Sequence, residues 1–232
     1  VGIGYFIVFG RRLLPAENSD VDVDQQETLI EAWRLPTEIW YYTITSRSHL
    51  IGKTRESAHL WDDYSLYLLV LADGDDVIYA PWRHTTFQTD QQMAVLGERE
   101  GAVRFATDYS LKELGEECSL SGRLQGGMEG GFAELVVRPR AAISGLTPRQ
   151  IELRKSIGVE PIVLMSGSQE VRSDFSDTPL STGDTLVVYG PWSALAPLQR
   201  DSDFVLVTPI EPSAHPSRQP LVAIGCFALG IG

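Results

Sequence analysis

Three cations in the second half of the chain could together meet an anionic ligand: Arg149, Arg154 and Lys155. Arginine and lysine bind carboxylates and phosphates through charge-assisted hydrogen bonds. Arg149 precedes the Arg154-Lys155 pair by about one helical turn, so a helix would bring the three side chains close together. We name them as candidate ligand-binding residues; the alternative is that they form a solvated helix face.

Other groups that could do chemistry have less support. The four histidines lack the spacing of a metal site; they are His49, His59, His84 and His215. The glycine-rich run 126–131 lacks the preceding strand and the following Lys-Ser/Thr of a phosphate loop. The acidic run 73–76 lacks the pattern of a calcium loop and lies where a hairpin turn is due. We therefore predict no catalytic residue, no metal and no cofactor, with a hydrolase that uses Asp184 or a histidine as the alternative.

Gly183 and Asp184 directly precede a run, 185–189, that is typical of a buried strand. Glycine can take a positive φ, and an adjacent aspartate can accept hydrogen bonds from nearby backbone amides. The pair is therefore predicted to close a turn.

The elements that must position these residues occur twice. Matching residues recur at one spacing, 145 − 52 = 93, without a gap; the clearest pairs are Gly52 with Gly145, Thr54 with Thr147, and Gly97 with Gly190. A period this long indicates a duplicated domain, because solenoid repeats are about 20 to 50 residues long.

The second copy predicts the order β-α-β-β-β-α-β. Strands are expected at 132–138, 159–165, 169–173, 185–189 and 204–208, and helices at 147–157 and 192–198. Thr147 is the predicted N-cap of the first helix, with Pro148 at its first position and Gln150 completing a capping box. Short strands with few helices favour an α+β fold, in which each copy is a mostly antiparallel sheet with two helices on one face.

The remaining segments are assigned by composition. The two domains, 31–110 and 132–210, are separated by a Gly-rich linker, 111–131, with an acidic linker at 13–30 and a short one at 211–219. The apolar ends, 1–12 and 220–232, are too short to span a bilayer and are interpreted as the end and the start of transmembrane helices. The alternative is that both ends are core strands of a soluble protein.

Charge and cysteine content narrow the setting. The formal charge of −12 argues against nucleic acid as a partner, because affinity for nucleic acid is mostly charge neutralisation. Cys118 and Cys226 are too few for a disulfide framework, which fits a reducing compartment. Arg11 and Arg12, just after the first apolar run, place the intervening loop on the cytoplasmic side.

Four strings of the second copy resemble the C-terminal subdomain of RCK/TrkA proteins (RCK_C, or TrkA-C) over 132–209: ELVVRPR, ISGLT, PIVLM and LSTGDTLVVYG. The first copy, about 38–108, is similar in SHLIGKT but carries Asp90-Gln91 in place of Gly183-Asp184. Two such domains in tandem, flanked by apolar runs, look like the large cytoplasmic loop of a sodium-coupled anion permease of the SLC13/divalent-anion symporter type.

The resemblance implies a regulatory function. RCK_C domains dimerise and act as ligand sensors on transport systems, and some bacterial members bind cyclic di-AMP at the dimer interface. It therefore implies a homodimer with a nucleotide or cyclic dinucleotide ligand, attached to the transmembrane part of the same permease on the cytoplasmic face of a bacterial inner membrane. Two alternatives remain: an assembly module without a small-molecule ligand, and a soluble hydrolase.

Overall fold

The structure is a computed structural model that describes residues 19–115, 118, 120–124, 130–172 and 174–208, with the side chains of 19–24 and 122–123 left out. The predicted apolar ends and the linker at 211–219 lie outside the described residues. No helix among the described residues is long and apolar enough to cross a membrane.

The first copy is a five-stranded antiparallel sheet in the order β3-β2-β4-β1-β5. Its elements are β1 (Ile39–Thr43), a 3₁₀ turn η1 (Glu56–Ala58), α3 (Leu60–Tyr64), β2 (Tyr67–Asp73), β3 (Asp76–Tyr79), β4 (Gln92–Leu96), α4 (Arg99–Asp108) and β5 (Lys112–Leu114). The acidic run 73–76 forms the β2–β3 hairpin turn, in which Asp73 pairs with Asp76. The predicted Gly-rich linker, 111–131, is wrong in part: β5 belongs to the first sheet, helix α5 (Ser121–Leu124) follows it, and the second sheet begins at Gly130.

The second copy repeats this sheet strand for strand, in the order β8-β7-β9-β6-β10. Its elements are β6 (Gly130–Val137), α6 (Leu153–Ser156), β7 (Glu160–Ser166), β8 (Gln169–Val171), β9 (Thr185–Pro191), α7 (Trp192–Leu195), the 3₁₀ helix η3 (Ala196–Arg200) and β10 (Phe204–Leu206). The sequence offset even places the irregularity of β2, between Leu68 and Val70, on that of β7, between Pro161 and Val163. The predicted α+β fold with two antiparallel sheets is confirmed.

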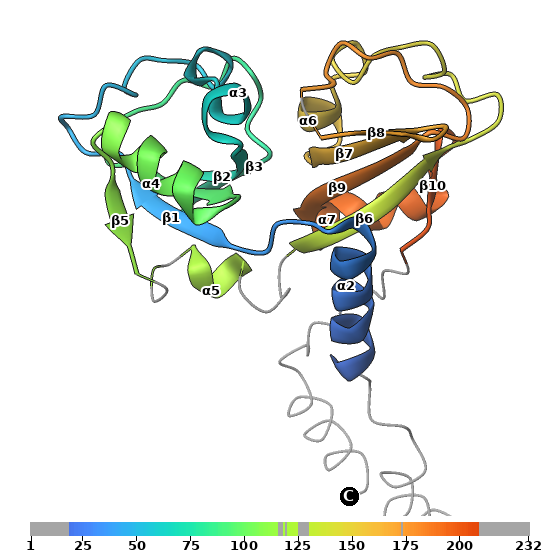
Figure 1. Cartoon of the computed structure of the whole chain (residues 1–232), viewed down its shortest axis with the longest axis horizontal. Helices are drawn as coiled ribbons and strands as arrows, with labels where there is room; N and C mark the ends of the chain where they lie inside the picture. Colours follow the sequence, from blue (N-terminus) through green and yellow to red (C-terminus); the bar gives the residue numbers. More distant parts are fainter. Residues whose placement is uncertain (1–18, 116–117, 119, 125–129, 173, 209–232) are drawn as a thin grey trace, which may run out of the picture.

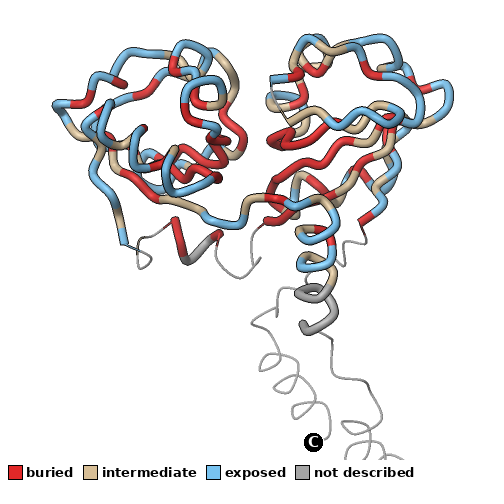
Figure 2. The backbone as a smooth tube through the Cα atoms, viewed as in Figure 1, coloured by how far each residue is buried: buried red, intermediate tan, exposed pale blue. Residues whose placement is uncertain are grey.

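The described residues form three apolar cores. One lies between each sheet and its own helices: Tyr42 and Phe105 belong to the core of the first copy, and Leu135 and Leu195 to that of the second. The third joins the opposite faces of the two sheets and contains Leu69 and Ile162. The two copies therefore lie side by side as one body, with the buried strands turned inward (Figures 1 and 2). The face that a single copy would leave open is covered by the other copy of the same chain.

The turn before β9 is built as the sequence predicts. Gly183 has φ +86°, and its amide donates to the Val137 carbonyl at 3.0 Å. Asp184 is 3% exposed, and its carboxylate accepts a hydrogen bond from the Ser181 amide at 2.7 Å. Both residues thus have structural roles in this turn.

The first copy builds the same turn from different residues. Asp90 stands at the position of Gly183 with φ +63°, which aspartate tolerates better than most residues. Gln91 stands at the position of Asp184, and its side-chain oxygen accepts from the Gln88 amide at 2.9 Å. The replacement of Gly-Asp by Asp-Gln therefore conserves the backbone conformation and the hydrogen bond.

Gly183→Val is expected to lower the free energy of unfolding by about 1 to 3 kcal/mol. A Cβ at Gly183 would meet nothing within 4 Å, so the cost comes from the positive φ alone. Asp184→Asn keeps an acceptor oxygen and should cost about 1 kcal/mol or less. Chemical denaturation measures both, with Gly183→Asp, which copies Asp90, as the matched control. A fully stable Gly183→Val would contradict this account of the turn.

The first helix of the second copy is much shorter than predicted. Residues 147–152 form turns, and α6 begins only at Leu153. The predicted capping box is present: the Thr147 amide donates to Gln150 Oε1 at 2.9 Å, and the Gln150 amide donates to Thr147 Oγ1 at 3.1 Å. Glu152 has φ +51°, however, and this left-handed residue separates the capped turn from α6.

The acidic linker predicted at 13–30 is contradicted over 19–30, which belong to helix α2 (Ser19–Trp33). The helix packs on β6 of the second copy. Leu29 is buried there, and the Gln26 amide group exchanges two hydrogen bonds of 2.9 Å with the backbone of Phe132. The spacing of Leu29 and Trp33 places both on one face of the helix.

Candidate functional site

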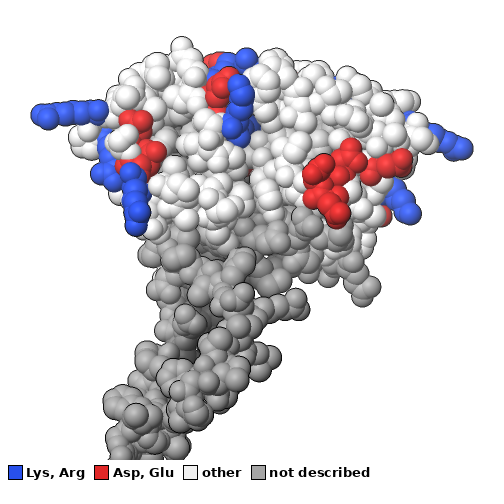
Figure 3. Space-filling view, turned by 180° about the vertical axis from the view of Figure 1, so that it is seen from behind, with Lys and Arg blue, Asp and Glu red and all other residues white. Residues whose placement is uncertain are grey.

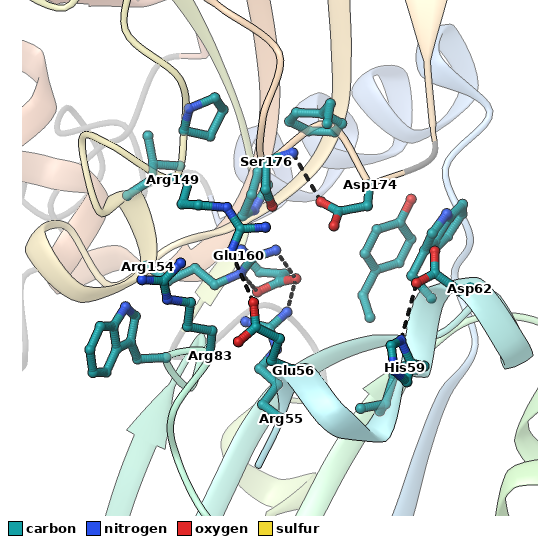
Figure 4. A pocket seen from close by; sticks show the side chains of 18 of the residues that line it. Arg55, Glu56, His59, Asp62, Arg83, Arg149, Arg154, Glu160, Asp174 and Ser176 are labelled. Carbon is teal, nitrogen blue, oxygen red and sulfur yellow. Dashed lines mark hydrogen bonds and ion pairs between the residues drawn. The ribbon is translucent and has the colours of Figure 1, made fainter.

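A pocket of about 320 Å³ lies between the two copies (Figure 4). The first copy lines it with residues from 55–67 and 82–83, and the second with residues from 148–161 and 174–176. Because α3 and α6 are equivalent elements that lie opposite each other (Figure 1), both walls come from corresponding parts of the repeat.

The Glu160 carboxylate lies at the centre of the pocket and is only 1% exposed. Arg55 Nη2 of the first copy donates to Glu160 Oε1 at 2.5 Å. Arg154 Nε donates to Glu160 Oε2 at 2.9 Å, and Arg154 Nη2 donates to Oε1 at 3.2 Å. A buried carboxylate is tolerated only when it is paired and hydrogen-bonded, and Glu160 meets both conditions. This triad of Glu160, Arg55 and Arg154 joins the two copies at the start of β7.

The two arginines of this triad experience different fields. Burial, together with repulsion from Arg154, lowers the pKa of Arg55 to about 10, although Glu160 opposes the shift. Burial also acts to lower the pKa of Arg154, but Glu160 and Asp174 outweigh it, so the pKa of Arg154 is raised. Both guanidinium groups are therefore charged at neutral pH.

Arg149 links the walls of the pocket a second time. Its guanidinium binds Asp177 with two hydrogen bonds, of 2.7 and 3.1 Å, and its Nη1 donates to Glu56 Oε1 of the first copy at 2.9 Å. The hydrogen bonds with Asp177 and Glu56 raise the pKa of Arg149. Arg149 and Glu56 are equivalent positions of the repeat, so this ion pair joins corresponding places in the two copies.

Lys155, the third predicted cation, lies just outside the pocket. Its Nζ is 3.0 Å from Glu152 Oε2 and 4.9 Å from the centroid of the Trp82 ring in the first copy. The structure thus brings Arg149, Arg154 and Lys155 together around the contact between the copies. None of the three is a free cation, because each has a carboxylate partner.

The predicted caps hold the loops that carry the pocket residues. Thr54 precedes Arg55 and exchanges hydrogen bonds with Ser57, as Thr147 does with Gln150. The Gly52 amide donates to the Phe87 carbonyl at 3.0 Å, and Gly145 makes the equivalent bond to Leu180 at 2.7 Å. Gly183 and Asp184 do not line the pocket.

Sequence reasoning missed Arg55 and Glu160, the residues at the centre. Glu160 had one visible signal, since it is a charged residue that opens an otherwise apolar strand. Arg55 had none, because its partner is 105 residues away.

The histidines form no metal site within the described part of the chain. His59 lines the pocket, where its Nδ1 lies 3.5 Å from an Asp62 carboxylate oxygen, and both side chains are exposed. His215 and Cys226 lie outside the described residues.

No family model matches the chain, and no curated protein matches it. Solved structures give weak likenesses. The RCK_C domain dimer of S. agalactiae BusR in complex with c-di-AMP has 13% identity and a TM-score of 0.30, over 33% of this chain and 91% of that one. The GsuK RCK domain has 9% identity and a TM-score of 0.27, over 77% and 68%. The GsuK channel bound to NAD has 9% identity and a TM-score of 0.29, over 70% and 52%. The fold assignment rests on strand order and register.

Proposed function

We propose that the chain is a non-enzymatic regulatory module that senses a small ligand in the pocket between its two copies. The observation that supports this function is the pocket, whose walls come from both copies and whose volume of 320 Å³ falls within the range of about 300–1,000 Å³ for ligand sites. A ligand that contacts both copies stabilises one arrangement of the two over others. Such a change is what a regulatory module has to transmit.

The sequence resemblance supplies the setting of this proposal. Tandem RCK_C-like domains between two apolar runs are similar to the cytoplasmic loop of an SLC13-type permease, so the regulated partner would be the transmembrane part of the same chain at a bacterial inner membrane. The BusR and GsuK structures contain c-di-AMP and NAD, respectively. Nucleotides and cyclic dinucleotides are therefore the first ligands to test.

A ligand of the pocket should raise the melting temperature of the purified 13–219 segment, because it binds the folded state alone. At a ligand concentration of 100 times Kd, the added stability is about 2.7 kcal/mol. A thermal-shift screen with mononucleotides, dinucleotides and cyclic dinucleotides measures the effect. Ser176→Phe, which would fill the pocket, should abolish the shift, whereas Ser144→Phe, at an exposed site outside it, should not. No shift with any compound would count against ligand sensing.

A second candidate is an assembly module that dimerises the permease and binds no small molecule. One observation favours it: Arg149, Arg154 and Lys155 are already neutralised by carboxylates of the same chain. On the face shown in Figure 3, Lys and Arg also lie in small groups beside acidic residues rather than in one basic surface. A dimeric mass by light scattering, without any ligand-induced shift, would support this candidate.

A further inference from the structure

The two walls of the pocket are chemically unlike. Leu60 and Leu153 correspond in the repeat and are identical, but other corresponding positions that both line the pocket differ; three such pairs are Glu56 with Arg149, Trp61 with Arg154, and Tyr67 with Glu160. A ligand with two-fold symmetry presents the same groups to both walls. This pocket offers opposite charges or an aromatic ring against a charge, so it matches an asymmetric ligand.

Among the described arginines that line the pocket, one has no carboxylate partner. Arg55, Arg149 and Arg154 each have a carboxylate partner. For Arg83, no carboxylate of the described residues lies within ion-pair distance, and its buried Nε has no hydrogen-bond acceptor among them. A guanidinium that lines a pocket without a carboxylate partner can bind an anionic group of a ligand through charge-assisted hydrogen bonds, so Arg83 points to an anionic group that a ligand supplies.

Arg83 also has a second cation in its neighbourhood. Its guanidinium carbon lies 5.8 Å from the centroid of the Trp82 ring, and Lys155 Nζ of the other copy lies 4.9 Å from the same centroid. Figure 4 places Arg83 on the Arg154 side of Glu160. Because Lys155 is paired with Glu152 and lies outside the pocket, Arg83 is the cation without a carboxylate partner among the described pocket residues, and it lies toward one end of the pocket.

Two aromatic side chains of the pocket suit a flat group. Trp61 and Tyr67 line it and pack against each other with ring centroids 4.5 Å apart. The volume of 320 Å³ is near the lower end of the usual range for ligand sites, so the pocket has room for one small molecule.

From these observations we infer that the pocket binds one small asymmetric ligand, with a single anionic group at Arg83 and a planar ring against Trp61 and Tyr67. A mononucleotide has this chemistry, whereas a cyclic dinucleotide carries two phosphates and two bases related by symmetry. The inference rests on the proposed function, since it names the class of ligand for the same site.

The test is isothermal titration calorimetry on the 13–219 segment with AMP as the probe and c-di-AMP, adenosine and inorganic phosphate as comparisons. We expect AMP to bind once per chain and at least tenfold more tightly than each of the other three. Arg83→Gln should weaken AMP binding about tenfold or more, because it removes a charge-assisted hydrogen bond, and Arg83→Lys should weaken it less. Arg47→Gln, at an exposed site outside the pocket, should leave the affinity unchanged.

Three results would overturn the inference: tighter binding of c-di-AMP than of AMP, undiminished AMP binding by Arg83→Gln, or no binding of AMP. Tighter binding of c-di-AMP would leave the proposed sensing function in place, and so would a thermal shift caused by any other compound of the screen. Only the absence of a thermal shift with every compound of the screen contradicts both the inferred ligand class and the proposed sensing function. The melting temperature of free Arg83→Gln shows whether its fold is intact.

Discussion

Glu160→Gln is expected to lower the free energy of unfolding by about 3 kcal/mol or more. The substitution removes the one negative charge that both Arg55 and Arg154 contact. It leaves two arginines, whose side chains are 12% and 23% exposed, facing each other with only the Asp174 carboxylate, which forms no ion pair with either, to offset them. Removing one partner of a buried ion pair costs about 3 to 5 kcal/mol, because the remaining charge stays buried. Urea denaturation monitored by tryptophan fluorescence measures the change.

Glu170→Gln is the matched control for this experiment. Glu170 also pairs with an arginine, Arg172, but its side chain is 40% exposed, so its loss should cost at most about 1 kcal/mol. A Glu160→Gln protein as stable as the wild type would show that the triad does not hold the two copies together.

The same variant also tests the role of the pocket. With Glu160 neutralised, Arg55 and Arg154 become free to bind an anion from solution. Sulfate should therefore raise the melting temperature of Glu160→Gln more than that of the wild type, since ligand binding to the folded state adds stability. An equal response of the two proteins would mean that anions cannot reach this part of the pocket.

The parts of the fold that the sequence predicts are those that depend on local chemistry. The 93-residue offset, the turn at Gly183 and the capping box at Thr147 each involve residues within a few positions of one another, or a direct match between the two copies. Strand positions follow as well, because buried strands read as apolar runs. β7 begins within one residue of the predicted start, at Glu160.

The parts that the sequence does not predict depend on contacts between distant segments. Helix α2 precedes the first copy but packs on the second. Because its packing surface is distant in sequence, the polar composition of this segment suggested a linker. The predicted helix from Thr147 fails at Glu152, whose left-handed conformation no local propensity requires. The pairing of Arg55 with Glu160 exists only because the two sheets are placed face to face, and no spacing along the chain encodes that placement.

Gly101→Ala is the second substitution for which we expect a large effect. Gly101 lies in α4 where this helix crosses the end of α3, and a Cβ there would be 2.0 Å from the carbonyl oxygen of Tyr64. The obstacle is backbone, so no side-chain rotation relieves it. Tyr64 cannot easily move, since its ring packs against Phe105 in the core of the first copy.

The cost of this overlap should exceed the helix-forming advantage of alanine over glycine, which is about 1 kcal/mol. Overpacking of a core typically costs 1 to 3 kcal/mol and occasionally more, so we expect a net loss of about 2 kcal/mol. Gly115→Ala is the matched control, because Gly115 is exposed and its Cβ would meet nothing within 4 Å. It should change the free energy of unfolding by less than about 1 kcal/mol.

Gly101→Ala should affect the ligand site as well as the stability of the first copy. Relief of the overlap requires α3 to move away from α4, and α3 carries Trp61 and Asp62 on the wall of the pocket. The second copy has Ala194 at the position of Gly101, so that position of the second copy accommodates a Cβ. We therefore expect Gly101→Ala to weaken ligand binding at temperatures where it remains folded, as calorimetry would measure. Unchanged affinity in a destabilised variant would mean that α3 keeps its place and that the strain is absorbed within α4.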